Sequence, residues 1–96
     1  MEMDRLWEHT RKRHAQLKEY SNDPPDLMNL LLLSLQEGVG QAALNMLKLR
    51  KVRPGRKGSA TEGLQLALAS VIEIAMVALW ESTDDAPEVF RSRLWL

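Results

Sequence analysis

The fold of this 96-residue chain depends most on one apolar stretch, Leu64-Gln65-Leu66-Ala67-Leu68-Ala69-Ser70-Val71-Ile72-Glu73-Ile74-Ala75-Met76-Val77-Ala78-Leu79-Trp80. It predicts the larger part of a helix over residues 61–81. Glu73 is its only ionisable residue. A buried, unpaired carboxylate costs several kcal/mol, so we expect Glu73 to be paired, protonated or facing a pocket. If it is paired, the candidate partners are Arg50 and Arg53 across an oligomer interface.

A second long helix is predicted over residues 25–50. Its apolar residues cover more than one face, so it must be buried on several sides, which a monomer of this length can hardly arrange. Shorter helices are predicted over residues 1–22 and 84–95, and no stretch has the pattern of a strand. The sequence therefore predicts one all-α domain, a helical bundle built on a long helix hairpin and completed by forming a homodimer or a larger homo-oligomer.

Local signals place the ends of these helices. Proline is tolerated only in the first turn of a helix, so Ser21-Asn22-Asp23-Pro24-Pro25 separates the first helix from the second. The third helix is predicted to begin at a capping box, Ser59-Ala60-Thr61-Glu62. A similar spacing with aspartate in the last place precedes the fourth helix, in Ser82-Thr83-Asp84-Asp85.

Composition narrows the class of protein. The chain has no cysteine, which excludes disulfides, thiolate nucleophiles and cysteine-based zinc sites. Its thirteen basic and thirteen acidic residues cancel, and no aromatic residues are interleaved with the basic ones, so nucleic-acid binding is not expected. The N-terminus is too polar for a signal peptide, and polar residues interrupt both apolar segments. We expect a cytoplasmic protein without a membrane partner.

A basic segment joins the two long helices. It contains Lys51, and its candidate anion ligands are Arg53, Arg56 and Lys57, close to the predicted start of the third helix. Guanidinium groups and exposed backbone N–H groups at a helix start can hold a phosphate or another anion. A solvated loop is the alternative interpretation of the same residues.

Two motifs resemble a known family. Glu37-Gly38-Val39-Gly40-Gln41-Ala42-Ala43 resembles the first signature of MazG-like nucleotide pyrophosphohydrolases, usually Glu-Glu-Val-Gly-Glu-Ala-Ala. Ala67-Leu68-Ala69-Ser70-Val71-Ile72 resembles the second signature, usually Glu-Leu-x-Asp-Val-Ile, and Asp85-Ala86-Pro87-Glu88-Val89-Phe90 is similar to the tail of short actinobacterial members. The resemblance covers roughly residues 28 to 93. It implies a dimeric all-α bundle in which carboxylates of both motifs hold Mg²⁺ for hydrolysis of a nucleoside triphosphate to pyrophosphate.

The acids that such a metal site needs are mostly missing. Two acids of the first motif are replaced by Gly38 and Gln41, and the acid pair of the second by Ala67 and Ser70. Only Glu37 remains, whereas Mg²⁺ prefers several carboxylate and water oxygens. We therefore expect no metal and no cofactor.

The remaining polar residues suggest a different site. Glu73 lies three residues after Ser70, and Glu37 lies four before Gln41, so all four can meet if the helices pair as the resemblance implies. Glu73, with Glu37, would then be a general acid or base, and Trp80 would wall the pocket.

Three functions stay open on the sequence alone. The first is a non-catalytic module that binds a small organic ligand, or a protein, through an apolar pocket at the former metal site. The second is a metal-independent enzyme that uses Glu73 and Glu37 on an organic substrate. The third is a residual pyrophosphohydrolase with relocated acids.

Overall fold

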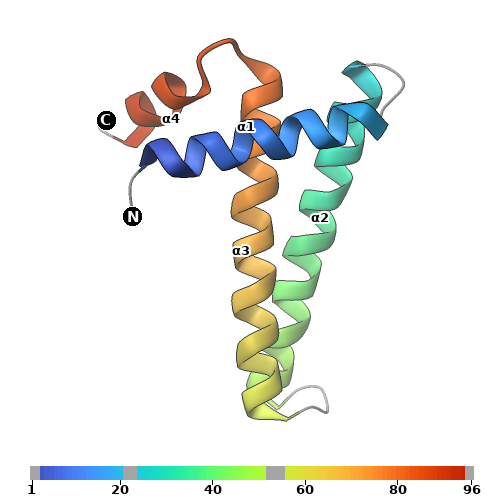
Figure 1. Ribbon diagram of the computed structural model, residues 1–96. Helices are drawn as coiled ribbons and strands as arrows, with labels where there is room; N and C mark the ends of the chain where they lie inside the picture. The colour runs from blue at the N-terminus through green and yellow to red at the C-terminus, as the bar shows by residue number, and fades with distance from the viewer. Residues whose placement is uncertain (1–2, 21–23, 52–55, 95–96) are drawn as a thin grey trace.

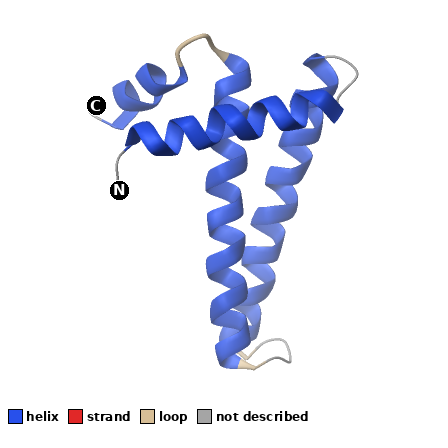
Figure 2. Ribbon diagram, viewed as in Figure 1, coloured by secondary structure: helices blue, strands red, loops and turns tan. Residues whose placement is uncertain are grey.

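The computed structural model describes residues 3–20, 24–51 and 56–94, and all regular structure within these ranges is helical (Figure 2). The helices are α1 (Met3–Tyr20), α2 (Pro24–Leu49), α3 (Lys57–Ser82) and α4 (Ala86–Leu94). α2 and α3 run side by side as an antiparallel hairpin, α1 crosses one end of it, and α4 lies beside the start of α1 (Figure 1). The prediction of an all-α fold built on a long hairpin is confirmed.

Helix α3 begins earlier than predicted. Its N-cap is Arg56, which makes no side-chain capping hydrogen bond, so Ser59 is already inside the helix and the predicted capping box is wrong. The Ala60 N–H donates to the Arg56 carbonyl at 2.9 Å, and Ala60 is only 1 % exposed. Burial of Ala60 favours one more helical turn over the local hydrogen bond that a capping serine offers.

The cap of α4 is formed by the last residue of the predicted motif. Asp85 Oδ1 accepts a hydrogen bond from the Glu88 N–H at 3.3 Å, which is the geometry of an N-cap aspartate. The predicted turn at 21–23 and the last residue of the predicted 84–95 helix, Trp95, lie outside the described residues.

Two apolar clusters fasten α1 to the hairpin. In the first, Trp7 of α1 is 7 % exposed and lies 6.3 Å from Trp80 and 5.7 Å from Phe90 between ring centroids. In the second, Leu27 and Leu31 of α2 pack with the fully buried Val77 of α3, joined by the partly buried residues Leu17, Ile74 and Ala78. Each cluster joins three helices, so α1 is part of the core.

The two hairpin helices approach each other closely at two glycines. A Cβ atom on Gly63 would lie 2.4 Å from Asn45 Oδ1, and one on Gly38 would lie 2.8 Å from Val71 Cγ2. Both distances are shorter than a van der Waals contact, so any larger residue would force the neighbouring side chain to move. The two glycines therefore set how close α2 and α3 lie.

Much of α3 remains uncovered. Only 17 % of its most apolar window is buried, and by length and composition alone Gly58–Ser82 is apolar enough to cross a membrane, with a mean hydropathy of 1.8. This differs from the expectation that its polar residues interrupt it too often. The core helix of a bundle meets the same criteria.

Candidate functional site

A groove of about 430 Å³ lies between α2 and α3. Each helix lines it with five residues at successive steps of three, one, three and four positions, which place them on one helix face. The lining residues are Ser34, Glu37, Gly38, Gln41 and Asn45 from α2, and Gly63, Leu66, Ala67, Ser70 and Ile74 from α3. The two glycines of the close approach lie in this lining.

Five residues that the sequence singled out come together in this groove. They are Glu37, Gly38 and Gln41 of the first motif and Ala67 and Ser70 of the second. The two motifs therefore face each other across the groove, although 25 residues of the chain separate Gln41 from Ala67. Antiparallel pairing of α2 and α3 is the reason, because it sets these two helix faces opposite each other.

The groove is lined by both polar and apolar side chains, whereas the sequence predicted an apolar pocket. Its α2 wall carries a carboxylate, two amides and a hydroxyl, whereas its α3 wall is apolar apart from Ser70. Asn45 is 9 % exposed, and its Nδ2 donates to the Gln41 carbonyl at 2.9 Å, which holds the amide in place beside Gly63. A ligand here would meet hydrogen-bonding groups on one side and hydrocarbon on the other.

Glu37 is the only charged residue in the lining. It is exposed, and it makes no ion pair or hydrogen bond with any other residue in the described part of the chain. The electrostatics of the groove are therefore those of one unneutralised carboxylate open to solvent.

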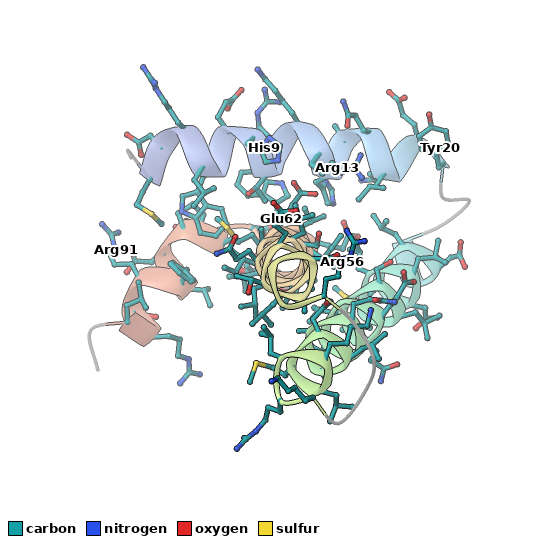
Figure 3. All side chains as sticks on the ribbon, turned by 90° about the horizontal axis from the view of Figure 1, so that it is seen from below. His9, Arg13, Tyr20, Arg56, Glu62 and Arg91 are labelled. Atoms are coloured by element: carbon teal, nitrogen blue, oxygen red, sulfur yellow. The ribbon has the colours of Figure 1, made fainter. Side chains whose placement is uncertain are left out.

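Glu73 does not lie in the groove, contrary to the prediction. Its Oε2 lies 2.9 Å from His9 Nε2, and its Oε1 lies 3.5 Å from Arg13 Nε, both on α1. Figure 3 shows His9 and Arg13 on the side of α1 that faces α3. The expectation of a paired carboxylate holds, but the partners come from the same chain, 64 residues away for His9, and not from Arg50 or Arg53.

A second pair of the same kind was not predicted. His14 Nε2 of α1 is hydrogen-bonded to Glu81 Oε2 of α3, and both side chains are only 13 % exposed. His9 and His14 lie five residues apart on α1, a spacing that does not suit two ligands of one metal ion. No local signal in the sequence indicates these two pairs, because they form only where α1 crosses α3.

The other predicted site residues lie elsewhere. Trp80 packs against Trp7 in the first apolar cluster and does not line the groove, so its predicted role as a pocket wall is not supported. Arg56 is exposed at the start of α3. Arg53 and the side chain of Lys57 lie outside the described residues, so the predicted anion site is described only at Arg56.

The donor set of the groove does not fit Mg²⁺. Glu37 is its one carboxylate, Gly38 and Ala67 offer no side-chain oxygen, and Gln41 and Ser70 offer only neutral oxygens. Within residues 3–20, 24–51 and 56–94, no three His, Asp or Glu side chains gather as they do around a metal ion. A divalent cation that needs several hard anionic oxygens would therefore be held weakly here.

Comparison with protein-family models, with curated proteins and with solved structures finds no match to this chain. The resemblance to MazG-like enzymes therefore rests on the two sequence motifs alone.

Proposed function

We propose that this protein is a MazG-like scaffold that has lost the metal-binding carboxylates and now binds a small organic molecule without catalysis. The observation that carries the proposal is the groove itself. Residues of both degenerate motifs line one space of about 430 Å³, a volume within the range of ordinary small-molecule sites. The groove has kept hydrogen-bonding groups and lost all but one of the expected acids.

The chemistry of the lining indicates a class of ligand. Glu37 supplies one unneutralised negative charge, and Gln41 and Ser70 supply neutral donors and acceptors beside it. Leu66 and Ile74 supply hydrocarbon on the α3 wall. This arrangement suits a small amphipathic cation, whose ammonium group pairs with Glu37 while its apolar part lies against α3.

Neither catalytic alternative is favoured by a specific observation. An acid–base enzyme would need Glu73 beside Glu37, but Glu73 is engaged with His9 and Arg13 on α1. A residual pyrophosphohydrolase would need relocated acids around a metal–triphosphate complex, and the groove contains only the one carboxylate. Binding without catalysis requires only the groups that are present.

A pair of probes of similar shape and opposite charge tests the proposal. We expect 3-phenylpropylamine to shift amide resonances of groove residues in a ¹H–¹⁵N titration, and 3-phenylpropionate to shift them much less. Glu37→Gln should remove this preference, because it removes the only charge in the lining. Glu62→Gln is the matched control, since Glu62 is an exposed acid of α3 outside the groove.

Two results would overturn the ligand class. One is an equal response to both probes, and the other is a response centred away from the groove. A separate calorimetric titration with Mg²⁺ and a non-hydrolysable nucleoside triphosphate tests the loss of the metal site. We expect no heat of binding, whereas metal-dependent triphosphate binding that disappears in Glu37→Gln would restore the pyrophosphohydrolase alternative.

A further inference from the structure

The polar groups of the groove form a regular row along α2. Glu37, Gln41 and Asn45 follow one another at steps of four residues, so their side chains project from one face of the helix. At 1.5 Å per residue each step is about 6 Å, and the whole row is about 12 Å long. The carboxylate stands at one end, and the two carboxamides follow it. A ligand that uses all three groups must therefore be elongated and must bind in one direction.

The two ends of this row differ in exposure as well as in charge. Glu37 is exposed, whereas Asn45 is 9 % exposed and is held by its hydrogen bond to the Gln41 carbonyl. The groove ends where Asn45 meets Gly63, at which a Cβ atom would lie 2.4 Å from Asn45 Oδ1. The row therefore runs from an open, charged end to a buried, uncharged one.

The groove is about as wide as one extended polymer chain. Its lining spans positions 34–45 of α2 and 63–74 of α3, which is about 16.5 Å along each helix. The volume of about 430 Å³ spread over that length gives a mean cross-section of about 26 Å², or about 5 Å across. Extended chains in a β-sheet lie about 4.8 Å apart, so one chain needs about this width. A single extended chain therefore fits along the groove.

We infer that the groove binds a short peptide by its free amino end, an inference that rests on the proposed function of the groove. The terminal ammonium group pairs with Glu37, and the peptide groups that follow lie along Gln41 and Asn45. Every second peptide group of an extended chain points the same way, at intervals of about 6.7 Å, close to the 6 Å steps of the row. A carboxamide both donates and accepts, so it can pair with the N–H or the C=O of a peptide group.

The α3 wall is compatible with such a chain. Leu66 and Ile74 offer hydrocarbon to the side chains of a bound peptide, and Ser70 offers a hydroxyl to its backbone. Leu66 and Ser70 are exposed, so the groove is open along this wall. Peptide groups that point away from α2 therefore stay in contact with water and need no further partner from the protein.

The order of charges distinguishes a peptide from two other elongated amines. A polyamine would bring further ammonium groups beside Gln41 and Asn45, which are neutral, so those charges would have no counterion in the row. An alkylamine would cover both carboxamides with hydrocarbon and leave them without hydrogen-bond partners, which is unfavourable. A peptide has one terminal charge followed by neutral polar groups, the same order as the row.

Three derivatives of alanine test this inference in ¹H–¹⁵N titrations of the wild-type chain. Tetraalanine amide has the amino group and enough peptide groups to reach Asn45. Alaninamide keeps only the amino end, and N-acetyl-tetraalanine amide keeps the peptide groups without the charge. We expect tetraalanine amide to bind at least about tenfold more tightly than either, because it alone can pair with Glu37 and with both carboxamides.

A variant tests the carboxamides separately from the charge. Gln41→Leu keeps the size of the side chain but removes its hydrogen-bonding groups, and it should reduce the preference for tetraalanine amide over alaninamide at least about fivefold. Gln36→Leu is the matched control and should keep the preference, since Gln36 is also an exposed glutamine of α2 but lies outside the groove. Circular dichroism checks that both variants remain helical, and the comparison of ligands on the wild type needs no variant.

The outcomes separate this inference from the proposed function. If tetraalanine amide binds no more tightly than alaninamide while 3-phenylpropylamine still binds through Glu37, the peptide inference is wrong and the proposed function stands. Tighter binding of spermidine than of tetraalanine amide would also overturn the inference, because it would identify a polyamine as the ligand. If none of these amines binds, or if Glu37→Gln leaves their binding unchanged, the inference and the proposed ligand class are both wrong.

Discussion

Replacing Gly63 by alanine is expected to destabilise the hairpin, although alanine is the better helix former. In the interior of an exposed helix the exchange of glycine for alanine gains about 1 kcal/mol. At Gly63 the new methyl group would lie 2.4 Å from Asn45 Oδ1 and 2.8 Å from both Cγ and Nδ2 of the same side chain. The whole amide must therefore move or the two helices must separate.

The cost of moving that amide can be estimated from its contacts. Asn45 is 9 % exposed and donates to the Gln41 carbonyl at 2.9 Å, so its displacement breaks a hydrogen bond in a place that water reaches poorly. An unsatisfied buried polar group costs about 1–3 kcal/mol, and strain from overpacking adds about the same. After about 1 kcal/mol of gained helix propensity is subtracted, we expect a net loss of about 1–5 kcal/mol.

Urea unfolding followed by circular dichroism measures this loss, with all variants compared at the same protein concentration. Gly40→Ala is the matched control, since a Cβ atom there would meet nothing within 4 Å, and it should stabilise the protein by about 1 kcal/mol. Asn45→Ala combined with Gly63→Ala removes the obstructing amide and should recover most of the loss.

Two results would refute the reasoning. If Gly63→Ala is as stable as Gly40→Ala, the close approach of α2 and α3 at this point does not exist in solution. If the double-mutant cycle between positions 45 and 63 yields a coupling energy below about 0.5 kcal/mol, the two residues act independently and the contact is not the cause.

Three further predictions concern the other helices. His14→Ala should lower the free energy of unfolding by roughly 1–3 kcal/mol and speed amide exchange in α1, because it leaves the largely buried Glu81 carboxylate without its partner; unchanged exchange in α1 would contradict this. Asp85→Ala should cost about 1 kcal/mol in urea unfolding, because it removes the N-cap of α4. The hydrogen bond from Arg11 lowers the pKa of Glu8, so Arg11→Gln should raise that pKa towards its usual 4.5 in an NMR titration of the carboxyl carbon. Because this folded-state pKa is lowered, the contribution of the pair to stability is present at neutral pH and is lost as the pH falls through the lowered pKa.

Local pattern was sufficient to predict the long helix hairpin, whereas the meeting of the two motifs was expected only from the resemblance. The two long apolar segments and the proline pair separate the helices, and these are properties of neighbouring residues. Glu37 and Gln41 lie on one helix face because they are four positions apart. Ala67 and Ser70 also lie on one face, because they are three positions apart. Which faces of the two helices meet is set by their close approach at Gly38 and Gly63, and not by spacing along either helix.

The errors arose where a distant segment competes with a local signal. Ser59 has the residue type and spacing of a cap, but burial of Ala60 extends α3 beyond it. Trp80 lies close in sequence to the residues predicted to form the pocket. In the structure it packs instead with Trp7 of α1 and Phe90 of α4. A helix cap is worth about 1 kcal/mol, an amount that packing between helices can offset.

The sequence by itself determined an all-α chain and its long hairpin, because helix periodicity depends on residues at most four positions apart. Only the tertiary structure decided what Glu73 does. The crossing of α1 over α3 brings His9 and Arg13 to that carboxylate and leaves Glu37 as the single charge in the groove. No local pattern encodes the meeting of residues 64 positions apart, since it arises from the packing of apolar faces between helices and not from the spacing of the residues that meet.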